Sequence, residues 1–151
     1  MLGGIIKYGR FITKKFSESL SQFERTISMD NLSALKDLNL LDQIKYVCAM
    51  DGLINVVFGD YADLLEGRSI VSFIDEKINA KADLTVNHVQ DKDATHCIIF
   101  ISCNVECKLS DMMDVLDKVF DEYPEIDLIY GAGYNEDLKE NELKVFGLFV
   151  A

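Results

Sequence analysis

Proline, basic residues and long hydrophobic runs are all scarce in this 151-residue chain, and each shortage excludes a class of protein. Pro124 is the only proline, so no proline-rich linker separates parts of the chain. The 15 Lys and Arg residues are outnumbered by 26 Asp and Glu residues, which gives a formal net charge of -11. Because such an acidic protein repels phosphate groups, we expect no nucleic-acid partner. Apolar runs fall well short of the roughly 20 residues that a membrane-spanning helix needs.

Cysteine and histidine are too few and too scattered to indicate a metal centre. The chain has two histidines and four cysteines, and no two cysteines have the C-x2-C spacing of a zinc site. Cys97 and Cys103 lie on one expected strand, about 20 Å apart at the usual rise per residue. We therefore expect no metal, no cofactor and no catalytic residue, and we expect the strand cysteines to be small buried residues. The first residues also lack the apolar stretch and cleavage site of a secretion signal, so a cytoplasmic protein with reduced thiols is expected.

Apolar residues make up 49% of the chain, enough for one domain with a core, and they are patterned. In residues 1–28 they recur every three or four positions, as on one face of an amphipathic helix. This stripe consists of Ile12, Phe16, Leu20, Phe23 and Ile27. We expect this segment to dock on a domain formed by residues 29–151, but two alternatives remain open: the stripe binds a partner or a second copy, or the helix lies on an anionic membrane surface. The basic residues that favour the membrane alternative are Lys7, Arg10, Lys14 and Lys15.

Helical and strand patterns alternate along the rest of the chain. A helix is predicted from Asp30, a suitable N-cap, to about Met50, and a short helix over "DYADLLEGR". Another is predicted over 109–123, with Ser110 as its cap. Its expected buried face comprises Leu109, Met112, Met113, Leu116, Val119, Phe120 and Tyr123. Strands are predicted in "SIVSFID", "HCIIFISC", "IDLIYGAGY" and "ELKVFGLFV", whereas residues 77–93 fit either a helix or a strand.

This order of elements predicts an α+β fold. We expect a two-layer sandwich, in which a four-stranded mixed sheet is covered by helices and preceded by the N-terminal helices. A ferredoxin-like or related split arrangement is the expected topology.

The stretch "GLINVVFGD", residues 52–60, is unusual because it places an Asn and an Asp inside an apolar segment. It resembles the loop G-[LM]-[IM]-N-x-D-[FY]-A-D in the C-terminal domain of FtsZ, the bacterial member of the tubulin superfamily. The stretch "CIIFISCNVECKLSDMMDVLDKVFDEY" is similar to the strand, turn and helix of that domain, and "IDLIYGAGYNEDLKENELKVFGLFV" to its closing hairpin. The resemblance covers about residues 30–151 and implies a fold related to ferredoxin-like and chorismate-mutase-like sandwiches.

Two departures from that family bear on function. The chain has no glycine-rich signature of the GGGTGTG kind, so we expect it neither to bind nor to hydrolyse GTP alone. In FtsZ, the first and last acids of the loop reach the GTP of the neighbouring subunit and polarise the attacking water. Here the first acid position is Val57, while Asn55 and the last acid, Asp60, are retained.

The resemblance implies that residues 52–60, which we name the interface loop, contact another protein. The candidate residues of this loop are Leu53, Ile54, Asn55, Val57, Phe58 and Asp60. We expect its polar residues to lie at the interface and its apolar residues to anchor the loop in the domain. A purely structural interpretation also stands, in which Asn55 caps a turn and Asp60 stabilises the start of the next helix. The leading functional hypothesis is a non-enzymatic module that binds or caps a filament-forming partner, of the FtsZ family, or that self-associates. The alternative is a ferredoxin-like regulatory module that binds a small ligand in a sheet-edge or dimer groove.

Overall fold

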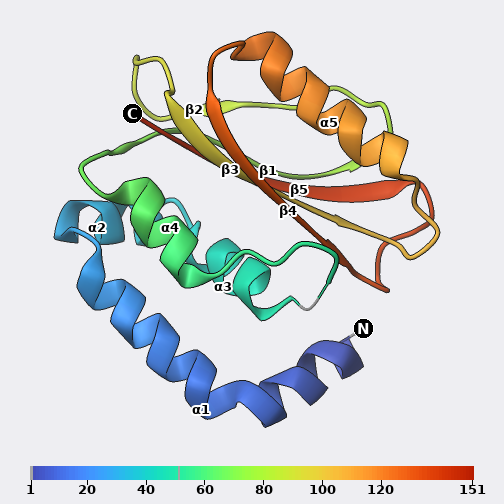
Figure 1. Ribbon diagram of the computed structural model, residues 1–151, viewed down its shortest axis with the longest axis horizontal. Helices are drawn as coiled ribbons and strands as arrows, with labels where there is room; N and C mark the ends of the chain where they lie inside the picture. The colour runs from blue at the N-terminus through green and yellow to red at the C-terminus, as the bar shows by residue number, and fades with distance from the viewer. Residues whose placement is uncertain (1, 51) are drawn as a thin grey trace.

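A five-stranded mixed sheet lies at the centre of the molecule, with the strand order β2-β1-β5-β3-β4 (Figure 1). The computed structural model describes the backbone of residues 2–50 and 52–151 and the side chains of residues 14–50 and 52–151. The strands are β1 (Ile70–Asn79), β2 (Asn87–His88), β3 (His96–Cys103), β4 (Asp127–Tyr134) and β5 (Glu142–Val150). β5 pairs antiparallel with both β1 and β3, and β3 pairs parallel with β4.

Helices cover both faces of this sheet (Figure 1). On one face lie α1 (Leu2–Thr26), α2 (Met29–Asp37), α3 (Leu41–Ala49) and α4 (Phe58–Leu65); α5 (Leu109–Glu122) lies on the other. Each face has its own hydrophobic core. The predicted α+β class is confirmed, but the sandwich has three layers where two were expected, because the helices that precede and follow β1 pack on opposite faces.

The strand β3 shows how one segment serves both cores. Ile98 and Phe100 point into the core beneath α1 to α4, whereas Ile99 and Ile101 point into the core beneath α5. Because successive side chains of a strand point to opposite faces, a strand buried on both sides must be apolar throughout. This requirement explains the uninterrupted run "CIIFI".

The sheet has five strands where four were expected, because the segment after β1 contributes a short one. Residues 77–93 do not form a helix: β1 continues to Asn79, and the chain returns to pair Asn87 and His88 with Phe73 and Ser72. The strand pattern in "DLTVNHV" was therefore the correct interpretation of this segment.

The predicted helix from Asp30 to Met50 is two helices, which corrects the sequence interpretation. Asn39 adopts a left-handed conformation with φ of 59°, and the chain turns between α2 and α3 at this residue. Asn is among the few residues that adopt this conformation at low cost. The N-cap is Ser28, not Asp30, and its side chain accepts the backbone N–H of Asn31 at 3.1 Å.

The helix α5 begins and ends close to the predicted residues, but its buried face is rotated. Val115 is buried, although the predicted face did not include it. Leu109, Met113 and Phe120, which were expected to be buried, are 71%, 43% and 41% exposed. The N-cap position is Lys108, without a side-chain hydrogen bond, instead of Ser110.

The N-terminal helix α1 docks on the rest of the domain, which was the expected arrangement. Phe23 and Ile27 are buried, and Phe16 and Leu20 pack against the same core. The ring of Phe58 at the start of α4 lies 5.3 Å from that of Phe16 and 5.4 Å from that of Phe23. The side chain of Ile12, the first residue of the predicted stripe, lies outside the described residues.

Candidate functional site

The interface loop is attached to the edge strand of the sheet. Ile54 and Ala132 form an isolated antiparallel bridge, in which each backbone N–H donates to the carbonyl of the other residue at 3.0 Å. The approach is close because both segments carry glycine: a Cβ on Gly52 would lie 2.6 Å from the Cα of Gly133. A Cβ on Gly131 would in turn collide with the side chain of Val56. The two glycines of the "GAG" sequence in β4 therefore leave the space that the loop backbone needs to reach the sheet edge.

The two polar side chains of the loop make local hydrogen bonds, as the structural interpretation expected. The Oδ1 atom of Asn55 accepts the backbone N–H of Gly52 at 3.3 Å and closes a turn. The carboxylate of Asp60, at the third position of α4, accepts the backbone N–H of Val57 at 2.9 Å. Val57 itself has no side-chain acceptor, so Asp60 provides only one half of the usual reciprocal cap. These bonds hold the loop in one conformation.

Apolar residues of the loop divide into anchors and exposed residues. Val56 is 3% exposed and Phe58 is 7% exposed, so both fasten the loop to the core beneath α1 to α4. Leu53, Ile54 and Val57 are 52%, 40% and 55% exposed. Phe58 is thus an anchor, as was expected of the apolar residues of the loop, whereas the exposure of Leu53, Ile54 and Val57 departs from that expectation. The three exposed aliphatic side chains, with the exposed Asn55 beside them, form the outer surface of the loop.

A polar network holds the helix that leads into the loop. The Tyr46 hydroxyl of α3 donates to Ser102 Oγ at 3.1 Å and accepts from Asn135 Nδ2 at 2.8 Å. The ammonium group of Lys144 lies 3.9 Å from the centre of the Tyr46 ring. Burial lowers the pKa of Lys144. The network joins α3 to β3, β5 and the segment after β4, and sequence reasoning missed it because its members are far apart in the chain.

A groove of about 640 Å³ lies beside the loop, between α1 and α4. Its apolar lining includes Phe16, Phe23, Val57 and Phe58, and Lys15 and Asp63 also line it. Cys48 lines the groove as well, and burial, with a smaller effect of Asp60, raises the pKa of its thiol to about 12. At neutral pH Cys48 is therefore a neutral thiol and a poor nucleophile.

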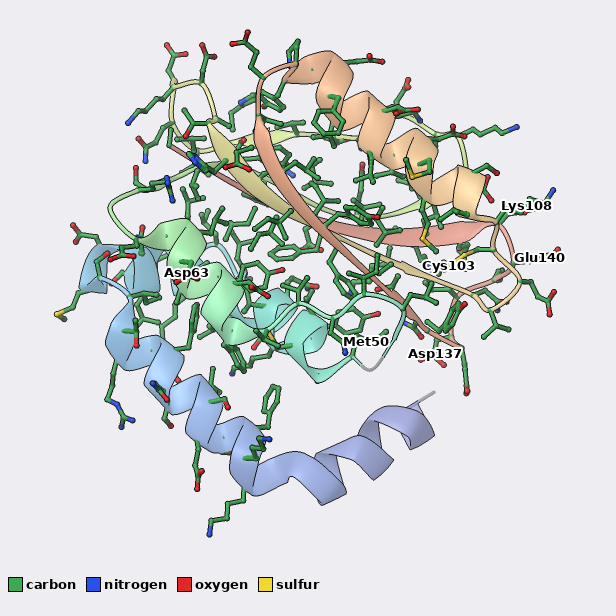
Figure 2. All side chains as sticks on the ribbon, in the orientation of Figure 1. Met50, Asp63, Cys103, Lys108, Asp137 and Glu140 are labelled. Carbon is green, nitrogen blue, oxygen red and sulfur yellow. A yellow bond between two sulfur atoms is a disulfide. The ribbon has the colours of Figure 1, made fainter. Side chains whose placement is uncertain are left out.

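The cysteines are not all reduced, which corrects the sequence expectation. Cys103, at the end of β3, forms a disulfide with Cys107 before α5, and their Cα atoms are 6.1 Å apart. Figure 2 shows Cys103 at the same end of the molecule as Lys108, Asp137 and Glu140. Cys97 is a buried free thiol, and burial is the main cause that raises its pKa to about 12.

Membrane-spanning helices and metal clusters are both missing from the part of the chain that the structure describes. No helix there is long and apolar enough to cross a bilayer. No group of three or more His, Cys, Asp or Glu side chains in that part is placed to hold a metal ion.

The fold is similar to solved structures of FtsZ from M. jannaschii. An empty FtsZ dimer matches with a TM-score of 0.57 and 19% sequence identity over 83% of this chain. A W319Y mutant of FtsZ matches with a TM-score of 0.54 and 21% identity, again over 83% of this chain. The chain has an FtsZ-like fold.

The match covers less than half of each FtsZ chain. The chain spans 40% and 42% of the two FtsZ chains, in agreement with the predicted resemblance to one domain of that protein. No protein-family model matches the sequence, and no curated protein matches it either. The likeness at this level of identity describes the fold alone.

Proposed function

We propose that this chain is a non-enzymatic interaction module that binds an FtsZ-family filament, or a second copy of itself, through the interface loop. The observation that carries the proposal is the exposure of Leu53, Ile54 and Val57 on a loop whose backbone is fixed at both ends. Exposed aliphatic side chains that cluster on one segment are typical of protein contacts. A loop that is already ordered loses little conformational entropy when it binds.

The altered loop favours contact without catalysis. By resemblance to FtsZ, both loop acids are needed near the neighbouring subunit's GTP, but this chain has Val57 at the first position. The retained Asp60 carboxylate is already bonded to the Val57 N–H. Residues 1–151 offer the loop surface and carry no glycine-rich GTP signature, so by resemblance to FtsZ they would bind one end of a filament and block further addition there. We therefore propose capping, with no rise in GTP hydrolysis per subunit.

Self-association is the other form of the same proposal. One of the matched FtsZ structures is described as a dimer, which supports contacts between similar folds. A self-associating chain would use the same exposed loop residues, so the two forms differ in partner and not in surface.

Electron microscopy of purified FtsZ filaments, with and without this protein, tests the capping proposal. Shorter filaments at substoichiometric protein, with unchanged GTP turnover per FtsZ subunit, are the expected result. Leu53→Asp, at an exposed position, should abolish shortening without unfolding the protein. Val89→Asp is the matched control, because Val89 is 40% exposed and lies outside the loop. Unchanged filament lengths at equimolar protein would show that capping is wrong, and a concentration-dependent dimer that Leu53→Asp disrupts would then support self-association.

A regulatory module that binds a small ligand is the second candidate function. The groove between α1 and α4 supports it, since about 640 Å³ is within the usual range for small-ligand sites. A ligand that occupies the groove should raise the melting temperature in a thermal-shift screen. Ala62→Phe, which narrows the groove, should remove that shift while leaving filament shortening intact.

A further inference from the structure

The outer edge of β4 has backbone groups that no other segment covers. The N–H groups of Asp127 and Asn135 donate inward, to the carbonyls of Thr95 and Cys103, whereas Ala132 bonds outward to Ile54. Backbone groups alternate between the two sides of a strand, so those of Leu128 and Tyr130 also point outward. In the described part of the chain, only the bridge at Ala132 pairs with this side of β4. An uncovered edge of this kind is a template for another strand.

Apolar side chains flank the uncovered edge on both faces of the sheet. Ile129 is 48% exposed on the face of α1 to α4, and Tyr130 is 42% exposed on the face of α5. The assignment of Tyr130 follows from Leu128 and Ala132, both of which belong to the core beneath α5.

Three exposed apolar residues of α5 form a stripe that faces the same edge. Leu109, Met113 and Phe120 are spaced by four and seven residues and therefore share one side of the helix. Lys118, on the opposite side of the helix, donates to the carbonyl of Ala82, which follows β1. In the strand order, β1 and β4 lie on opposite sides of the central strand β5. The apolar stripe, on the side of α5 away from Lys118, therefore faces β4. Figure 1 shows α5 on the face of the sheet opposite α1 to α4.

The charges around the edge are acidic. Asp114, Asp117 and Asp121 lie on the outer side of α5, next to the stripe, whereas Asp111 and Glu122 lie with Lys118 on the side of β1. On the other face, at the start of β4, the side chain of Asp127 is 73% exposed, and its carboxylate lies 3.6 Å from Nε2 of His96. A second copy paired edge to edge would bring these acids together, so charge complementarity favours a basic occupant.

We propose that β4 from Asp127 to Tyr130 is a docking site for an extended segment of a partner protein that alternates apolar residues with Lys or Arg. The segment adds a strand to the sheet and bonds to the outward backbone groups of Leu128 and Tyr130. Its apolar side chains lie on the face of Tyr130 and the α5 stripe. Its basic side chains lie on the opposite face, beside Asp127, and the acids of α5 add only a longer-range attraction. This site is separate from the interface loop, which is bonded to β4 at Ala132 and lies against Gly131 and Gly133.

A capped, fluorescent octapeptide of alternating valine and lysine is the probe for this site. Its binding to the full chain should raise fluorescence anisotropy, and amide exchange at Leu128 and Tyr130 should slow when the peptide is present. The same peptide with glutamate in place of lysine should not bind. Added salt should weaken binding of the lysine peptide, because the contacting charges are exposed.

Tyr130→Pro separates backbone pairing from simple charge attraction. Proline removes the outward N–H of residue 130 but leaves the inward bonds from β4 to β3 intact. We expect affinity for the valine–lysine peptide to fall about tenfold, through loss of a hydrogen bond and its neighbouring contact. Phe120→Ser should also weaken binding, whereas Met29→Ser, at an exposed apolar residue on the opposite face, should not.

Three outcomes would overturn the proposal. One is binding of the peptide with no slowing of amide exchange at Leu128 and Tyr130 in the unmodified protein, a readout that does not depend on any variant folding. Another is equal binding of the lysine and glutamate peptides, or no binding of either. The third is a dimer in sedimentation that Tyr130→Pro dissociates, which would assign the edge to a second copy.

Discussion

The Asp60 carboxylate accepts the backbone N–H of Val57 at 2.9 Å, and this bond joins the interface loop to the first turn of α4. Asp60→Ala should therefore lower the free energy of unfolding by about 1 kcal/mol, the usual cost of losing a helix cap. Urea denaturation measures the difference. Asp60→Asn retains an acceptor and should lose much less stability; an equal loss in both variants would contradict a capping role.

Val57 occupies the N-cap of α4 without a side-chain acceptor. Val57→Asp supplies one and should raise the free energy of unfolding, by roughly 0.5–2 kcal/mol. The same change restores the first acid of the FtsZ-like loop. With FtsZ filaments present, GTP turnover should rise above that seen with the unmodified protein. A rise in stability without any rise in turnover would support the cap and contradict contact between the loop and GTP.

Phe23 of α1 is 2% exposed and belongs to the core beneath α1 to α4. Phe23→Ala should cost about 3–5 kcal/mol, the range observed when a buried phenylalanine is truncated. Phe16→Ala should cost less because Phe16 is only partly buried. Met29→Ala, at a residue that is 84% exposed, is the control and should change the free energy of unfolding little. Equal effects at Phe23 and Met29 would mean that α1 is not docked in solution.

Glu142 accepts the N–H of Lys139 at 2.8 Å and lies 3.5 Å from the ammonium group of Lys77. The backbone hydrogen bond is the main cause that holds the pKa of Glu142 below its ordinary value of 4.5. A carboxylate with a lowered folded-state pKa stabilises the protein above its unfolded pKa, and this contribution is lost as the pH falls. Glu142→Gln should therefore be less stable than the unmodified protein at pH 7, with the gap closing below pH 4.5. Urea denaturation across this range would contradict the assignment if the gap stayed constant.

The thiol pKa of Cys48 and that of Cys97 are both raised to about 12. Iodoacetamide reacts with thiolates, so at pH 8 alkylation of the folded protein should be about a thousandfold slower than for a free cysteine. In urea without reductant, Cys48 and Cys97 should be alkylated and the Cys103–Cys107 pair should not. Peptide mass spectrometry identifies the modified residues. Labelling of Cys103 or Cys107 in that experiment would contradict the disulfide.

Local patterns predicted the strands β3 and β5 and the helix α5 well, because the strands are nearly continuous apolar runs and the helix has a clear helical period. The rotation of the buried face of α5 could not be predicted in this way. Leu109, Met113 and Phe120 lie beside the buried residues on the helix surface, and periodicity alone does not separate the two groups. They are exposed because β4 is an edge strand and the sheet ends beneath them.

Residues of the candidate site were predicted by type more accurately than by orientation. The loop followed from the resemblance, and Phe58 is an anchor as expected, packed against the rings of Phe16 and Phe23 of a distant helix. The other apolar residues were also expected to be anchors, but Leu53, Ile54 and Val57 are exposed. The break at Asn39 was missed because Asn occurs within helices as well as at left-handed turns. The glycines of β4 were a usable signal: Gly131 and Gly133 flank Ala132, where the loop is bonded.

The central position of β5 has a consequence for synthesis on the ribosome. β1 and β3 are both bonded to β5 and not to each other, although β5 comes last of the strands. Until residues 142–150 have emerged, β1 has only the short β2 as a partner, and β3 has only β4. The nascent chain therefore carries two separate halves with open edges, and the final strand joins them in one late step.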